Sequence, residues 1–222
     1  MTPSKGNPVT SSGAPSREAA SAFIRVKSLR IGGVEPLTTV DFPGRLAAVV
    51  FCQGCPWRCP YCHNPALQPY GKGTIGWEDV VGFLDQRRGF LDGVVFSGGE
   101  PTMQPGLDDA VREVRDMGFA VGLHTAGMNP SALAVLLPRL DWVGFDVKAP
   151  LGPVYDALTG RAGSVERVKR SLVLLRDSGV PFVLRTTLDR DWLGPVEEAG
   201  IVDDLAGLGL PPPVWQVCRK PM

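Results

Sequence analysis

Short apolar runs alternate with segments of helical periodicity along the chain from residue 45 onward. Residues 46–51 have the sequence LAAVVF, a continuous apolar run that is typical of a strand buried on both faces. Similar short runs follow at residues 93–96, 120–123, 142–145, 182–184 and 214–217. The segments between these runs place apolar residues three and four positions apart, as amphipathic helices do.

This alternation predicts an α/β fold. About six strand–helix units imply a parallel sheet with right-handed crossovers. The 222 residues are too few for a closed eight-stranded barrel, which takes about 250. We therefore predict a partial (β/α)6 barrel of parallel strands with the helices outside.

Polar side chains follow these predicted strands, each at the point where a strand ends. The first strand runs into a group of cysteines, the second into residues 97–100 (SGGE) and the third into His124. Asp146 and Lys148 follow the fourth strand, and Arg185 follows the fifth. Because the carboxyl ends of parallel strands meet at one mouth, we expect these groups to converge on a single ligand site.

The amino-terminal segment and the overall composition limit the class of protein. Residues 1–22 contain three Pro, five Ser and almost no large apolar group, which predicts a disordered tail before one domain at 23–222. Lys and Arg number 23 against 23 Asp and Glu, without a basic run, which argues against a nucleic-acid partner. The longest apolar run is too short to span a membrane, and no secretory signal is evident. We expect a soluble, cytoplasmic protein.

Four of the five cysteines are crowded into the loop after the first strand, and the fifth is Cys218. In a reducing compartment such crowding indicates metal or redox chemistry rather than disulfides. A structural zinc would use all four thiolates, but its two cysteine pairs are normally farther apart in sequence. The spacing C-x3-C-x2-C suits three corners of an iron–sulfur cube, with one iron left open. The three cysteines at this spacing are Cys55, Cys59 and Cys62.

Cys52 is open to two interpretations. In the first, Cys52 is a fourth ligand that closes the cluster. In the second, it is a buried thiol that packs as a small hydrophobe, and we favour this interpretation because Cys52 ends an apolar run. Cys218 is expected to be a packing residue or a free thiol.

Several motifs together resemble the radical S-adenosylmethionine superfamily. The cysteine spacing, with an aromatic residue before the last cysteine, and the later Gly-Gly-Glu carry this resemblance. More closely, the chain is similar to activating enzymes of glycyl radical enzymes, above all the anaerobic ribonucleoside-triphosphate reductase activating proteins. The segments that carry this closer likeness are LTTVDFPG at 37–44, QGC at 53–55, CHNP at 62–65, SGGEP at 97–101, HT at 124–125 and DVK at 146–148.

The resemblance implies one 4Fe-4S cluster and S-adenosylmethionine as cofactors. Cys55, Cys59 and Cys62 would hold the cluster, and Tyr61 would lie near the adenine. The other cofactor-binding positions implied are Ser97, Gly98, Gly99, Glu100, His124, Asp146, Lys148 and Arg185. Of these, Asp146, Lys148 and His124 are also the implied catalytic group, near the nucleoside, the methionine carboxylate or the substrate glycine.

Simpler interpretations stand beside these roles. His124 taken alone is more often a hydrogen-bonded strand-end residue than a catalytic one. Asp146 and Lys148 are two residues apart and suit a plain ion pair. Residues 41–44 suit a turn, as does Gly98-Gly99. The chain also departs from many relatives at Ala126, where they carry an asparagine.

The function implied is an activase that generates a glycyl radical on a partner enzyme, with a low-potential flavodoxin or ferredoxin as electron donor. Two alternatives remain at this stage. One is a radical S-adenosylmethionine enzyme acting on a small molecule such as a deazapurine precursor, and the other is a non-catalytic metal-binding protein.

Overall fold

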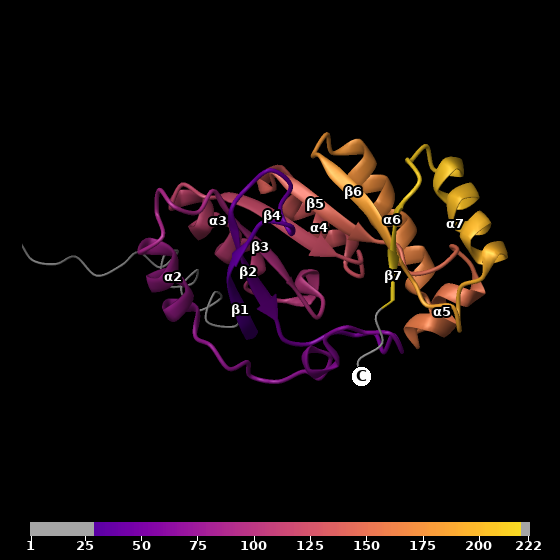
Figure 1. Ribbon diagram of the computed structural model, residues 1–222, viewed down its shortest axis with the longest axis horizontal. Coiled ribbons are helices and arrows are strands. Elements are labelled where there is room, and N and C mark those ends of the chain that lie inside the picture. Colours follow the sequence, from indigo (N-terminus) through magenta and orange to yellow (C-terminus); the bar gives the residue numbers. More distant parts are fainter. Residues whose placement is uncertain (1–28, 219–222) are drawn as a thin grey trace, which may run out of the picture.

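The computed structural model describes residues 29–218, which form one sheet with helices packed against it (Figure 1). The strands lie side by side in chain order, and β1 alone runs antiparallel to its neighbour while β2 to β7 are parallel. Their bounds are β1 Ile31–Thr38, β2 Ala47–Cys52, β3 Gly93–Gly98, β4 Ala120–Thr125, β5 Trp142–Asp146, β6 Phe182–Leu188 and β7 Val214–Val217.

Helices fill the connections between successive parallel strands. The α-helices are α2 Trp77–Asp85, α3 Leu107–Asp116, α4 Pro130–Leu136, α5 Pro153–Thr159, α6 Ser164–Asp177 and α7 Pro195–Gly207. Three short 3-10 helices, η1 Pro65–Leu67, η2 Pro101–Met103 and η3 Leu137–Arg139, complete the described elements. The predicted α/β partial barrel with six parallel strands is therefore confirmed. The predicted tail at 1–22 lies outside the described residues.

Among the strands and α-helices, two elements were not predicted. Strand β1 extends the sheet beyond the six parallel strands, but most of its positions are half-buried or exposed, so it lacks a continuous apolar run. Helix α5 has seven residues, too few to establish a helical repeat in the sequence.

The two faces of the sheet carry different side chains. One set of alternating positions, including Val94, Phe96, Val121 and Phe145, joins the large core beneath the helices. The other set faces the inside of the partial barrel, where a smaller apolar cluster consists of Phe42, Ala47, Val49, Val95 and Trp142. Because successive side chains point to opposite faces, the remaining inward positions on β3 to β6 are occupied near the strand ends by polar residues.

Phe42 closes the base of the barrel from the turn between β1 and β2. Its ring is buried and stacks on Trp142 with the ring centroids 6.0 Å apart. Glycines on neighbouring strands make room for it, because a Cβ at Gly93 would lie 2.9 Å from Phe42 Cε1 and one at Gly122 would lie 3.4 Å from Phe42 Cδ1. The space above this plug is left for polar side chains.

Within residues 29–218, no helix has the length and apolar character needed to cross a bilayer.

Candidate active site

The groups at the carboxyl ends of the strands line one cavity of about 290 Å³ inside the barrel mouth. The cavity contains every site residue predicted from the sequence, so the expected convergence of separate segments is present. These residues are Cys55, Cys59, Tyr61, Cys62, Ser97, Gly98, Gly99, Glu100, His124, Asp146, Lys148 and Arg185.

Backbone hydrogen bonds fix the loop that carries the three predicted cluster ligands. The Gly54 N–H donates to the Leu67 carbonyl over 2.8 Å and the Cys55 N–H to the Gln68 carbonyl over 2.9 Å. Arg58 anchors the middle of the loop, because its guanidinium donates to the carbonyls of Cys55 and Trp57, each over 2.7 Å. The thiols thus lie on a loop that hydrogen bonds to its own backbone and to residues 67 and 68 hold in place.

The four clustered cysteines fall into two environments. Cys52 is fully buried in the helix-side core, outside the cavity lining, and burial raises the pKa of its thiol far above the usual range. Cys55, Cys59 and Cys62 line the cavity and are partly exposed. The structure therefore favours the interpretation of Cys52 as a packing residue.

The glycine-rich turn after β3 fits against the cysteine loop. A Cβ on Gly98, which has φ +111°, would lie 2.4 Å from the Cys52 nitrogen, and one on Gly99 would lie 2.4 Å from the Gly54 oxygen. The Gly99 N–H donates to the Cys52 carbonyl over 2.8 Å. Both positions require glycine because the backbone of the cysteine loop approaches too closely to leave room for a Cβ. The turn lies on the cavity wall next to that loop.

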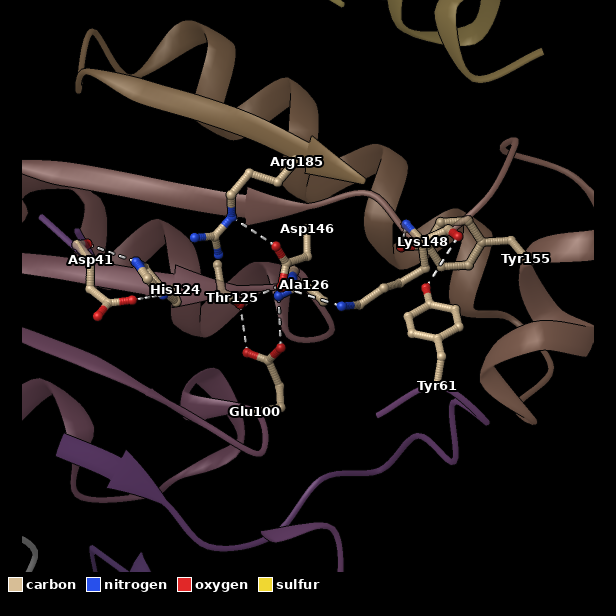
Figure 2. Close-up of polar contacts among 11 residues, drawn as sticks. Asp41, Tyr61, Glu100, His124, Thr125, Ala126, Asp146, Lys148, Tyr155 and Arg185 are labelled. Carbon is tan, nitrogen blue, oxygen red and sulfur yellow. Dashed lines mark hydrogen bonds and ion pairs between the residues drawn. The ribbon is translucent and has the colours of Figure 1, made fainter. Parts of the chain in front are cut away.

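Glu100 is a buried carboxylate without a cationic partner among the described residues. It is 1% exposed and accepts hydrogen bonds at Oε1 from the Thr102 N–H and hydroxyl and from the Thr125 hydroxyl. Among residues 29–218, its Oε2 accepts only from the Ala126 N–H, over 2.9 Å, so this oxygen keeps acceptor capacity (Figure 2). Because buried charges are normally paired, this carboxylate suits a positively charged ligand group in the cavity.

Asp146 joins the two cations of the cavity. Lys148 Nζ lies 3.2 Å from Asp146 Oδ2, and Arg185 Nε lies 3.0 Å from Asp146 Oδ1 (Figure 2). Burial acts to raise the pKa of Asp146, but the charges of Lys148 and Arg185 outweigh it and lower the pKa to about 2. The expected Asp146–Lys148 ion pair is present, and both cations keep further N–H donors for a ligand.

A tyrosine pair fixes the segment that carries Lys148. The Tyr61 hydroxyl donates to the Lys148 carbonyl over 3.4 Å, and the Lys148 N–H donates to the Tyr155 hydroxyl over 3.3 Å. Burial raises the pKa of Tyr61 above its usual range, so its hydroxyl stays neutral. Tyr61 therefore connects the cysteine loop to Lys148, two residues after the end of β5.

His124 is hydrogen-bonded to the turn between β1 and β2, which also carries Phe42. Its Nε2 lies 2.9 Å from the Asp41 carbonyl, to which it donates (Figure 2). The centroid of its ring lies 5.4 Å from that of Trp142. Burial, with the positive charge of Arg185, lowers the pKa of His124 to about 4. The imidazole is thus neutral at ordinary pH and has the hydrogen-bonded environment of the simpler interpretation, while still lining the cavity.

Several cavity residues were not predicted from the sequence. Thr187 and Gln216 lie at the ends of β6 and β7, and Asp41 reaches the cavity from the turn before β2. Thr187 is two residues after Arg185, so strand alternation could have indicated it. Trp57 also lines the cavity, and its buried Nε1–H has no hydrogen-bond partner in the described part of the protein.

Comparison with known proteins agrees with this geometry. Residues 49–199 match the family described as the Radical SAM superfamily. The chain therefore belongs to the radical S-adenosylmethionine superfamily, and it is an enzyme with that chemistry. Its cofactors are accordingly one 4Fe-4S cluster and S-adenosylmethionine.

Among its relatives are activating enzymes. The chain is 36% identical over 166 residues to a protein of Methanocaldococcus jannaschii named as a candidate glycyl-radical enzyme activating enzyme, covering 71% of this chain and 67% of that one. It is 34% identical over 138 residues to the pyruvate formate-lyase-activating enzyme of Clostridium pasteurianum, covering 60% and 58% of the two chains. The chain thus spans between half and two thirds of these relatives' lengths.

Solved structures show the same fold at low sequence identity. The structure of native anSMEcpe with bound AdoMet and the Cp18Cys peptide matches with a TM-score of 0.59 and 17% identity, covering 77% of this chain and 49% of that chain. QueE from Escherichia coli matches with a TM-score of 0.50 and 16% identity, covering 88% and 96%. These likenesses establish the partial barrel and nothing about the substrate.

The donor set of the cavity fits the two cofactors. Among residues 29–218, no three His, Cys, Asp or Glu side chains converge closely enough to share one metal ion. A cluster with irons at separate corners takes its thiolates from separate positions, which suits three cysteines spread along one cavity wall better than a single zinc does. The unpaired Glu100 carboxylate and the cations at Asp146 suit the ammonium and carboxylate of a bound amino acid.

Proposed function

We propose that this protein is an activase that generates a glycyl radical on a partner enzyme. The observation that carries the proposal is the single cavity in which three cluster-forming thiols lie beside Glu100 and the Asp146–Lys148–Arg185 ion pairs. When bound, the reduced cluster and S-adenosylmethionine supply a 5′-deoxyadenosyl radical, which takes a hydrogen atom from a glycine. The protein residues bind and orient the cofactors and exclude other reactants.

Each predicted site residue receives a role in this proposal. Cys55, Cys59 and Cys62 hold the cluster. Glu100 accepts from the ammonium group of the methionine moiety through Oε2, its oxygen with spare acceptor capacity, while Lys148 or Arg185 donates to the carboxylate.

Tyr61 lies near the adenine, and the Gly98-Gly99 backbone offers carbonyls to the ammonium group of the methionine moiety. These residues line the cavity together with Ser97. His124 closes the cavity floor in its neutral form. Ala126 leaves that position without a side-chain amide, and the Ala126 N–H is occupied by Glu100.

The substrate in this proposal is a protein. The names of the relatives support that class, and the motif resemblance points to anaerobic ribonucleoside-triphosphate reductase as the partner. The cytoplasm is the proposed compartment, because an exposed low-potential cluster requires reducing conditions.

The test is the direct detection of the radical. Anaerobically reconstituted protein, reduced with dithionite and given S-adenosylmethionine, is incubated with anaerobic ribonucleoside-triphosphate reductase or with pyruvate formate-lyase. A glycyl doublet in the EPR spectrum that requires Cys59 supports the activase. Release of 5′-deoxyadenosine without a doublet on either partner, but accelerated by a free metabolite, would overturn it in favour of a small-molecule substrate.

A further inference from the structure

The last strand of the sheet has a free edge in the described part of the protein. Within residues 29–218, β7 pairs with β6 alone and β1 lies at the opposite end of the sheet, so the partial barrel is open between β1 and β7 (Figure 1). All four positions of β7 are exposed, including Val214 at 56% and Val217 at 80%. The sequence of β7, VWQV, has neither a charge nor a proline, the features that usually protect an edge strand from pairing with another chain.

The backbone of β7 offers hydrogen-bonding groups to this opening. The Cys218 N–H, directly after β7, donates to the Leu188 carbonyl of β6 over 3.1 Å. Because the backbone groups of successive residues in a strand point to opposite edges, the N–H and C=O groups of Trp215 and Val217 point away from β6. Within residues 29–218, no other strand pairs with these groups. The edge therefore presents two residues with free donors and acceptors.

The same strand forms part of the cavity wall. Gln216 lines the cavity together with Thr187, its partner in the pairing of β6 and β7. Since successive side chains point to opposite faces, Gln216 faces the inside of the barrel and Trp215 and Val217 face the other way. A strand added to this edge would lie about 4.8 Å from β7, and its residue level with Gln216 would face the cavity. The free edge is thus continuous with the candidate active site.

We propose that the edge of β7 docks the glycine-bearing segment of the partner enzyme as an added β-strand. This inference rests on the proposed function, since it assigns how the protein substrate is held at the same site. Hydrogen bonds to the backbone of Trp215 and Val217 supply affinity in this mode of recognition. The uncharged edge suits an extended, uncharged segment.

Strand addition also provides a reason for the selection of glycine. At the position level with Gln216, any other residue directs its side chain into the cavity, whereas glycine directs a hydrogen atom there. This Cα hydrogen then faces the cavity that holds the cofactors in the proposed function. The docking step itself forms only hydrogen bonds between the two chains.

The experiment measures peptide binding to the cluster-loaded enzyme in the presence of S-adenosylmethionine. The probes are fluorescently labelled peptides of about ten residues, centred on the radical glycine of anaerobic ribonucleoside-triphosphate reductase or of pyruvate formate-lyase. The test variant, Val217→Pro, removes an N–H that points away from β6 and therefore leaves the pairing of β6 and β7 intact. The matched control, Val217→Ala, shortens the same exposed side chain and keeps the N–H.

We expect Val217→Pro to weaken peptide binding at least about fivefold and Val217→Ala less than about twofold, because only the proline leaves a peptide carbonyl without its donor. In the wild-type protein, bound peptide should slow hydrogen exchange of the Trp215 and Val217 amides at least about tenfold, with little change at the Gln216 amide, which is directed to β6. Both variants should retain dithionite-driven cleavage of S-adenosylmethionine, since Val217 lies outside the cavity lining.

Equal binding by the two variants, unchanged exchange at Trp215 and Val217, or failure of both peptides to bind the wild-type protein would overturn the proposal. Exchange at these amides that slows with enzyme concentration rather than with peptide would also overturn it, by assigning the edge to a second copy of this chain. The glycyl EPR doublet on an intact partner tests the activase separately. A doublet together with unchanged exchange would therefore reject the strand docking alone.

Discussion

At the residue scale, Asp146 determines the charge balance of the cavity. Its two oxygens each hold one cation, so a single carboxylate orients Lys148 and Arg185 and leaves their remaining donors free for a ligand. Since all three side chains are mostly buried, removal of the carboxylate leaves two cations without compensation.

We expect Asp146→Asn to lower the free energy of unfolding by about 2–4 kcal/mol and to abolish S-adenosylmethionine cleavage. The measurements are urea unfolding and 5′-deoxyadenosine release. Asp108→Asn is the matched control, because Asp108 also pairs with two cations, but these are more exposed: 50% for Arg112 and 34% for Arg139, against 17% for Lys148 and 16% for Arg185. The control substitution should lower the free energy of unfolding by less than about 1 kcal/mol and leave S-adenosylmethionine cleavage intact. Equal losses in both variants would contradict the assigned role.

The four loop cysteines give a second prediction. Cys59→Ala should lose the cluster and all cleavage, whereas Cys52→Ala should keep a full complement of iron and sulfide and remain active. The physical reason is that Cys52 points into the helix-side core and lies outside the cavity lining. The measurements are the iron content and the release of 5′-deoxyadenosine by each variant after anaerobic reconstitution. Loss of iron from Cys52→Ala would make Cys52 a fourth ligand.

At the scale of elements, successive side chains on each strand point to opposite faces of the sheet, so one set joins the helix-side core and the other faces the cavity. The strands β2 to β5 could be predicted because their apolar runs are continuous and mostly buried, and the polar residue at each strand end followed from that. Strand β6 alternates between buried and half-buried positions and β7 is exposed, so these two followed from their short apolar runs alone. Strand β1 could not be predicted, since it lies at the edge of the sheet and only two of its eight positions are buried. Asp41 was missed for the same reason, because its place in the cavity depends on where the turn after β1 folds back.

The turn between β1 and β2 provides a prediction at this scale. Phe42→Ala should lower the free energy of unfolding by about 3–5 kcal/mol, because it empties the base of the barrel beneath Trp142. Thermal unfolding should show a decrease in Tm of roughly 10 °C. Phe90→Ala, at a side chain that is 54% exposed, is the control and should change Tm by little. A similar Tm for both variants would show that the plug does not stabilise the barrel.

At the scale of the whole molecule, stability should depend on pH through His124. Its pKa is lowered to about 4 in the folded protein and returns to its usual value of about 6.5 on unfolding. The unfolded state therefore binds more protons between these values, and stability falls as the pH decreases through this range.

When the pH is lowered from 7.5 to 5.5, the titration of His124 should decrease the free energy of unfolding by about 1 kcal/mol. Urea unfolding at the two pH values measures it, with His124→Gln as the comparison, because glutamine keeps a donor for the Asp41 carbonyl but does not titrate. An equal pH dependence in both proteins would assign the effect to other groups. The pKa of Asp146 adds a loss only at more acidic pH, as the pH falls from about 4 toward 2.

The net charge of the whole chain gives no information on which charged residues come together in the fold. The sequence indicated neutrality, and no run of basic residues marked a binding surface. The contact of Arg30 with Tyr70 arises only in the fold, because the two residues are far apart in the sequence and the Arg30 guanidinium carbon lies 5.4 Å from the centroid of the Tyr70 ring. Motifs of adjacent residues, such as the cysteine spacing, can be found in a sequence, whereas a contact between distant positions cannot.

The plug at the barrel base has a consequence for how such a site can diversify. The floor of the chamber is formed by Phe42, which belongs to a connecting turn, while the walls belong to the sheet. Turns tolerate insertion and substitution far better than paired strands do. Chains of this type can therefore acquire a deeper or shallower chamber by exchanging one short connection. The cysteine loop and the ion pairs at Asp146 would stay in place, whereas the hydrogen bond from His124 to the Asp41 carbonyl would change with the turn.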